Sequence, residues 1–253
     1  MTRRFLAPLC AAVCALAVWE VLVGALDVKA FILPPPSDIG ASLLDGWAAL
    51  LSAAWHTLKL TWTALMVAIV LSLVLSLVFS ASKLVELTFY PYAVVLQVTP
   101  IIAIAPLIMI WVGLDNIDLA LIIIATLVAF FPLLTTLIQG LRSIDRSLKD
   151  LFKLYGANRW QTFVRLQLPA TLPAFLSGLK ISAGLALIGA VVAEFVAGSG
   201  TGQGLAWTML EASNRLKTDR MFAALIVLSG MGVAQYYLLA WLEEKLTGHW
   251  VGR

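Results

Sequence analysis

The sequence predicts an all-α membrane protein with six transmembrane helices. Hydrophobic residues make up 61% of its 253 residues and charged residues 12%, whereas soluble domains carry about 45–50% and about 25%. Four runs contain no charged residue, and each exceeds the ~20 residues that a helix needs to cross a bilayer. These runs are 60–82, 87–114, 119–141 and 221–242. A water-soluble core could not bury this much apolar surface, so each run is predicted to be a membrane-spanning helix.

Two further spans, 5–26 and 172–197, are interrupted by very few charges. Glu20 interrupts the first, and Lys180 and Glu194 lie near the two ends of the second. Basic residues precede the first span, as in a signal peptide, but its apolar stretch is longer than the usual 7–15 or so residues and lacks a small-residue cleavage site. We therefore predict a retained helix. Lys180 is expected to snorkel toward the membrane surface.

The connection after the first span contains three consecutive prolines at 34–36. Proline cannot continue a helix from its interior, because it lacks the backbone donor. Ser37 or Asp38 is then the expected N-cap of an amphipathic helix that lies along the membrane surface and runs through Leu51. A plain connector is the alternative.

The third span, 87–114, contains Pro91, Pro100 and Pro106. Each proline removes one backbone donor, so the span is predicted to be kinked or broken, which membranes tolerate only where protein or water covers the freed carbonyls. The polar residues beside the central proline, Gln97 and Thr99, are candidates for a substrate pathway, together with Pro100.

The distribution of basic residues predicts the orientation. With six spans both termini lie on one face, and that face receives twelve of the seventeen Lys and Arg residues. The positive-inside rule places this face in the cytoplasm. Six of the twelve fall in the loop 142–170. The net charge of +3 thus reflects topology, and no nucleic-acid partner is expected.

The sequence contains no motif for catalysis or for a metal. Cys10 and Cys14, one helical turn apart, are expected to be free apolar residues, and no Cys or His pair has the spacing of a zinc site. There is no Gly-Lys dipeptide, so a phosphate-binding GxxxxGK[ST] loop cannot exist. If the protein uses ATP, another chain must bind it.

The loop 142–170 is the most specific feature of the sequence. A helix is predicted over 144–155, a tight turn at Gly156, which has no Cβ, and a second short helix over 159–166 that stops at Pro169. Apolar side chains lie among the basic ones and form a continuous surface. They are Leu151, Phe152, Tyr155, Phe163 and Leu166.

This loop resembles the EAA loop of importer-type ABC transporter permeases, in which Glu-Ala-Ala is followed by three residues, Gly, nine residues and Ile-x-Leu-Pro. Gly156 and Pro169 stand at that spacing, with Leu168 before the proline and Leu166 at the isoleucine position. The sequence departs from the pattern at 150–152, where Asp-Leu-Phe replaces Glu-Ala-Ala and makes the contact surface bulkier.

The resemblance extends from about residue 31 to the C-terminus, because further segments look like those of the nitrate, sulfonate and taurine permease group. The segments that carry it are 33–37, 104–114, 178–181 and 193–195. It implies the transmembrane-domain fold of type I ABC importers, with 1–253 as a single permease domain, a core at about 55–240 and a cytoplasmic coupling loop at 142–170.

The resemblance also implies the partners. They are a second copy of the permease in a homodimer, two cytoplasmic ATP-binding subunits that hold ATP and Mg, an extracytoplasmic substrate-binding protein, and the lipid of a bacterial inner membrane. This chain would bind no cofactor and catalyse no reaction. ATP binding would drive alternating access by moving the coupling residues, which are Asp150, Leu151, Phe152, Tyr155, Gly156, Ala157, Arg159, Leu168 and Pro169.

Glu194 is the acid placed deepest in an apolar span, where a charge costs about 2.5–3.5 kcal/mol on insertion scales. It is predicted either to line the pathway or a gate, or to accept a structural hydrogen bond. The glycine-rich segment 198–204 is expected to be a flexible turn at the outer gate. Gly189, Ala193 and Ala197 recur every four residues and are expected to allow close helix contact, with the dimer seam as one location.

The leading hypothesis is the permease subunit of an ATP-driven importer for a small polar solute. Nitrate, sulfonates, taurine, thiamine precursors and other small heterocycles all remain open as cargo. A stand-alone channel or secondary transporter is the alternative, and the dense basic loop argues against it. A membrane enzyme is a third possibility, and the lack of a polar catalytic cluster argues against it more strongly.

Overall fold

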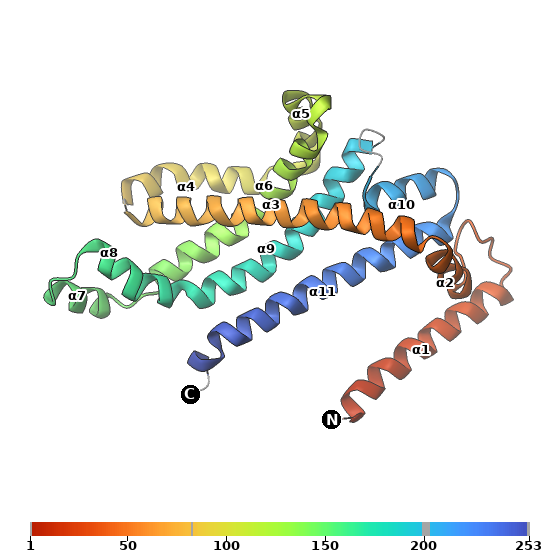
Figure 1. The fold of residues 1–253 in the computed structure, drawn as a ribbon, viewed down its shortest axis with the longest axis horizontal. Helices are drawn as coiled ribbons and strands as arrows, with labels where there is room; N and C mark the ends of the chain where they lie inside the picture. The colour runs from red at the N-terminus through yellow and green to blue at the C-terminus, as the bar shows by residue number, and fades with distance from the viewer. Residues whose placement is uncertain (1, 82, 199–202, 252–253) are drawn as a thin grey trace. The chain divides into compact units, whose positions relative to one another are not determined.

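The computed structural model describes residues 2–81, 83–198 and 203–251, and all regular elements of these residues are helices (Figure 1). Four of the described helices are long and apolar enough to cross a membrane: Trp47–Ser80, Ile117–Arg142, Arg159–Ala197 and Thr218–Thr247. Shorter apolar helices cover Cys10–Ala25 and Ile101–Val112. Helices therefore cover all six predicted spans. Most of the glycine-rich segment 198–204 lies outside the described residues.

The chain divides into two compact units. The first comprises Met1–His56 and Thr201–Gly230, and the second Thr57–Gly200 and Met231–Arg253. The first unit contains α1 (Thr2–Ala25), α2 (Pro36–Asp45), the start of α3 (Trp47–Ala81), α10 (Leu205–Asn214) and the start of α11 (Thr218–Val251).

Helix α2 begins earlier than predicted. Pro35 is its N-cap and Pro36 its first residue, where the fixed φ of proline suits a helix and its missing donor costs nothing. Ser37 is therefore inside the first turn, and the predicted cap at Ser37 or Asp38 is wrong. The predicted surface helix also ends at Gly46, and the residues after it begin α3.

Glu20 supplies the missing cap of α2 from α1. Its carboxylate accepts hydrogen bonds from the Ser37 backbone N–H at 3.1 Å and from the Ser37 hydroxyl at 2.7 Å. A carboxylate is stabilising at this position because the first N–H groups of a helix have no partner within it and carry partial positive charge. The acid in the first span is thus explained by a helix terminus.

The second unit contains the rest of α3 and α11 and the elements between them. These are α4 (Lys83–Val98), α5 (Ile101–Val112), η1 (Leu114–Asn116), α6 (Ile117–Arg142), α7 (Arg146–Leu154), α8 (Arg159–Thr162), the π-helical turn η2 (Phe163–Gln167) and α9 (Leu168–Ala197). The predicted break of the third span is confirmed at Pro100, which is the N-cap of α5. Pro91 and Pro106 lie inside helices α4 and α5.

Helices α6 and α9 pack closely because glycines lie between them. A Cβ on Gly140 would come within 2.7 Å of Ala174, and one on Gly189 within 2.9 Å of the Cα of Ala125. Gly189 therefore allows the close helix contact that was predicted, and this contact lies within the chain. Small residues allow such close approach in membranes, where association depends on van der Waals packing.

Helix α11 is fastened to α9 by polar side chains in the second unit. Lys180 forms an ion pair with Glu243, and the Ser177 hydroxyl donates to the same carboxylate at 3.0 Å. The buried Gln235 amide donates to the Ala183 carbonyl at 3.1 Å. Lys180 thus pairs with an acid of a neighbouring helix, a partner that the sequence analysis did not identify.

Candidate functional site

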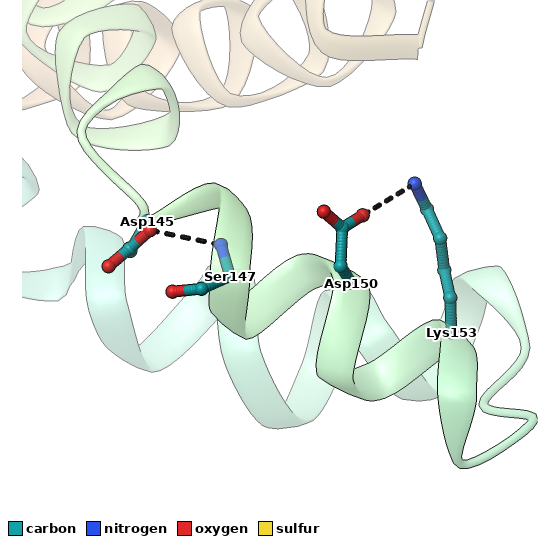
Figure 2. Close-up of polar contacts among 4 residues, drawn as sticks. All are labelled: Asp145, Ser147, Asp150 and Lys153. Carbon is teal, nitrogen blue, oxygen red and sulfur yellow. Dashed lines mark hydrogen bonds and ion pairs between the residues drawn. The ribbon is translucent and has the colours of Figure 1, made fainter.

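The connection between α6 and α9 is a helical hairpin, 145–169, whose first helix, α7, is capped by Asp145. The Asp145 carboxylate accepts from the Ser147 backbone N–H at 3.0 Å (Figure 2). This hydrogen bond lowers the pKa of Asp145, because it favours the ionised carboxylate. Asp150 pairs with Lys153 at 3.1 Å, one turn further along the same helix. Both side chains are exposed, so this pair contributes little to stability.

Gly156 closes α7 in a left-handed conformation, with φ of +69°. Its N–H donates to the Lys153 carbonyl at 3.0 Å, and the Ala157 N–H donates to the Phe152 carbonyl at 3.0 Å. These two hydrogen bonds form a Schellman motif, which satisfies the last carbonyls of a helix. A Cβ on Gly156 would meet no atom within 4 Å. Glycine is required here by backbone conformation and not by lack of space.

The second helix of the hairpin, α8, begins with a capping box. The Asn158 side chain accepts from the Gln161 N–H at 2.7 Å, and the Gln161 side chain accepts from the Asn158 N–H at 2.9 Å. The arrangement satisfies two donors of the first turn, which otherwise have no partner. The turn between α7 and α8 is therefore defined by hydrogen bonds on both sides.

The predicted stop at Pro169 is wrong, because the helix continues through it into α9. In η2 the Leu168 N–H donates to the Phe163 carbonyl, five residues earlier. Such a wide turn is a π-bulge, which changes the register of the hydrogen bonds. Pro169 stands at the second position of α9, directly after this π-bulge, where the register of the hydrogen bonds has changed. The hairpin is thus continuous with a membrane-spanning helix.

Several large apolar side chains of the hairpin are exposed to solvent, and we call four of them, near the turn between α7 and α8, the hairpin apolar surface. They are Leu151, Leu154, Tyr155 and Trp160, with exposed fractions of 45%, 85%, 83% and 71%. The sequence predicted Leu151 and Tyr155 as contact residues but missed Leu154 and Trp160. The Trp160 ring lies 5.8 Å from that of Phe163. Exposed apolar side chains gathered in this way mark an interaction surface.

The other predicted coupling residues lie on the same hairpin. Phe152 is half-buried, whereas Arg159 and Leu168 are exposed. Leu166 is buried and therefore supports the hairpin from within. The structure thus brings the nine predicted coupling residues onto one connected element.

Glu194 lies in the core of the second unit and is fully buried. It accepts a hydrogen bond of 2.8 Å from the Thr57 hydroxyl of α3. The Thr61 hydroxyl donates in turn to the Thr57 carbonyl at 2.7 Å. A buried carboxylate needs such donors to offset its loss of hydration. Glu194 therefore joins α9 to α3 by a hydrogen bond between residues 137 positions apart in the sequence.

The remaining pathway candidates lie at the break between α4 and α5. Gln97 and Pro100 are exposed and Thr99 is half-buried, with its hydroxyl donating to the Val95 carbonyl at 2.8 Å. On the far side of the break, Ala105 of α5 belongs to the buried apolar cluster that also contains Ala193, the neighbour of Glu194. The break therefore leads into a helix packed beside the part of α9 that carries Glu194.

Several helices that are long and apolar enough to cross a membrane, joined by a capped hairpin with an exposed apolar surface, are typical of a multi-pass membrane protein. The chain belongs to the family described as binding-protein-dependent transport system inner membrane component, which matches residues 68–248. It is therefore a permease of an ABC importer, as the EAA-like loop predicted.

Known relatives agree with this assignment. The chain is 31% identical to a probable ABC transporter permease protein of Haemophilus influenzae, over 97% of this chain and 98% of the relative. It is 31% identical to the formylaminopyrimidine transport permease protein ThiX of Halalkalibacterium halodurans, over 90% of each chain.

A solved structure agrees with the predicted fold class. A chain of the MetNI methionine ABC transporter in inward-facing conformations matches with a TM-score of 0.67 and 16% identity, over 79% of this chain and 97% of that one. At this identity the match shows the fold alone. The prediction of an all-α protein with the transmembrane-domain fold of type I ABC importers is confirmed.

Proposed function

We propose that this permease works as a homodimer in a bacterial inner membrane, with both termini in the cytoplasm. Two cytoplasmic subunits would bind ATP and Mg, and an extracytoplasmic binding protein would deliver the solute. The chain itself would catalyse no reaction and hold no cofactor. ATP-driven closure of the cytoplasmic subunits would switch the permease between inward-facing and outward-facing states.

The hairpin at 145–169 is the observation that carries this proposal. Its two helices are fixed by caps and by the Schellman motif at Gly156, so it can transmit a displacement as a unit. The hairpin apolar surface would enter a groove of the ATP-binding subunit, with Asp150 and Arg159 at its edge. Because η2 continues into α9, movement of the hairpin would move a membrane-spanning helix directly.

The proposed cargo is a small polar solute, and a small nitrogen heterocycle is the class that we favour. The formylaminopyrimidine permease among the relatives supports this class. Sulfonates, taurine and nitrate are the competing cargoes, and the buried carboxylate of Glu194 would disfavour these anions along a path beside it. We propose that Gln97, Thr99 and Pro100 line the path, and that the hydrogen bond between Glu194 and Thr57 holds α9 against α3 at a gate next to it.

Replacement of Gly156 by Asp tests the coupling role. A side chain at φ of +69° is strained, so the turn should open and the apolar surface should lose its shape. We expect a tagged Gly156→Asp permease to lose the ATP-binding subunit during purification in mild detergent, and uptake to fall by at least about tenfold, equivalent to about 1.4 kcal/mol.

Gly113→Asp is the matched control. Gly113 also has a positive φ, +88°, and open space around it, but it lies on the loop between the third and fourth spans. This variant should keep the ATP-binding subunit. Retention of that subunit by Gly156→Asp, with uptake intact, would exclude the importer mechanism proposed here. The cargo itself is best identified by measuring the affinity of the cognate binding protein for the competing solutes.

A further inference from the structure

A hollow of about 220 Å³ lies in the second unit, where α3, α4, α6 and α7 meet. Its lining combines an apolar floor with three basic side chains, and two serines complete it. The floor is formed by Phe79, Ile138 and Leu141, and the basic side chains are Lys83, Arg142 and Lys149.

The charge of this hollow favours an anion. Its lining includes three cations and, among the described residues, no acid. The Lys149 ammonium donates to the Leu141 carbonyl at 3.4 Å, which keeps the charge beside the floor. An ammonium has three N–H donors, so one such bond leaves capacity for oxygens of a ligand.

The apolar floor of the hollow also indicates what kind of ligand it would bind. Phe79, Ile138 and Leu141 are almost fully buried, whereas Leu77 and Val78, next to Phe79 on α3, are exposed apolar residues of the membrane-spanning helix. A ligand in the hollow would therefore have its charged part at the basic side chains and an apolar part continuing along α3. Phospholipids with an anionic headgroup have this division.

We propose that the hollow binds the headgroup of an anionic phospholipid such as phosphatidylglycerol. Basic pockets between membrane helices on the cytoplasmic side are suited to such headgroups. The choice of the cytoplasmic leaflet rests on the orientation given under the proposed function, whereas binding itself does not depend on that orientation.

The bound lipid would hold the root of the hairpin. Arg142 ends α6, Lys149 belongs to α7 and Lys83 begins α4, so one headgroup would join three elements. The position of α7 relative to the membrane-spanning helices would then depend on the lipid. Anionic lipid would therefore stabilise the position of the coupling hairpin.

Lipid-dependent thermal stability of the purified full-length permease tests this proposal. The probes are phosphatidylglycerol, phosphatidylcholine and inorganic phosphate, each added to protein in mild detergent, and native mass spectrometry measures the lipid that is retained. The wild type should retain phosphatidylglycerol in preference to phosphatidylcholine and unfold at a higher temperature with it. The double variant Lys83→Gln, Lys149→Gln should bind phosphatidylglycerol with about twenty-fivefold lower affinity, because each basic residue contributes about a factor of five to the binding constant.

The control variant also removes two positive charges, but at positions of the loop 142–170 that lie outside the hollow. Arg146→Gln with Arg165→Gln changes two exposed cations that do not line the hollow, and it should keep the response to phosphatidylglycerol. Lys83→Arg with Lys149→Arg should keep it too, which guards against loss by misfolding. Equal weakening in both glutamine pairs would show that total surface charge is responsible and would overturn the proposal. An equal response of the wild type to inorganic phosphate, or no preference over phosphatidylcholine, would also overturn it.

Discussion

Two acidic residues of this permease lie within apolar spans and are stabilised there by hydrogen bonds. Glu20 and Glu194 both interrupt apolar spans, and each has a defined hydrogen-bond donor. Glu20 caps α2, whereas Glu194 joins two helices of the core. An acid in a span is costly unless it faces water or a donor. Both acids follow this rule, although no pattern in the sequence names Ser37 or Thr57 as the donor.

Glu194→Gln separates the two roles open to this residue. Glutamine keeps an oxygen that can accept from Thr57 and removes only the charge. We expect this variant to unfold near the wild-type temperature and to retain uptake, because the hydrogen bond between α3 and α9 persists. Thr57→Val removes the donor and should destabilise the protein by about 1–3 kcal/mol, measured as a lower unfolding temperature in detergent. Normal folding of Glu194→Gln with abolished uptake would instead show that the charge itself serves the pathway.

At the scale of elements, helix packing is set by small residues that hydropathy does not identify. Gly178 of α9 faces Thr136 of α6, and a Cβ there would lie 2.9 Å from the Thr136 Cβ. The Thr136 hydroxyl is held by the Pro132 and Leu133 carbonyls at 3.0 and 2.9 Å, so this side chain cannot easily turn away. The contact therefore depends on the absence of a side chain at residue 178.

Gly178→Ala should accordingly destabilise the permease by about 1–3 kcal/mol through overpacking. Gly184→Ala is the matched control in the same helix, because a Cβ at Gly184 would meet no atom within 4 Å. Alanine also has the higher helix propensity, so this control should be neutral or slightly stabilising. Unfolding temperatures of the purified proteins measure both effects. If Gly178→Ala melted like the wild type, the close packing of α6 on α9 would be refuted.

The position of a helix or of a break was predictable wherever a single local property of the sequence determines it. Uncharged length predicted the spans, and Pro100 predicted the break between α4 and α5, because hydropathy and a missing donor act locally. Pro169 was misread because its effect depends on the π-bulge before it, which no residue type announces. In the hairpin, Gly156 was predictable from its spacing, whereas the exposure of Leu154 and Trp160 depends on how the two helices fold against the rest of the unit.

At the scale of the whole molecule, the orientation that we propose in the membrane rests on charge alone. Twelve of seventeen basic residues lie on the face assigned to the cytoplasm, and such a bias sets orientation during insertion. In the proposed orientation the hairpin is cytoplasmic, whereas α10, which lies between the fifth and sixth spans in the sequence, is extracytoplasmic. Coupling to cytoplasmic ATP-binding subunits requires this orientation, so a direct test of topology also tests the proposed mechanism.

Single cysteines provide that test. The test uses a Cys10→Ser, Cys14→Ser background. We expect Asn214→Cys to react with a membrane-impermeant maleimide in cells whose outer envelope is permeabilised and whose inner membrane is intact. Arg146→Cys should react only after the inner membrane is permeabilised. Both positions are exposed, so accessibility to the reagent depends on the side of the membrane and not on burial. Labelling of Arg146→Cys before permeabilisation would place the hairpin outside, where no ATP-binding subunit can reach it.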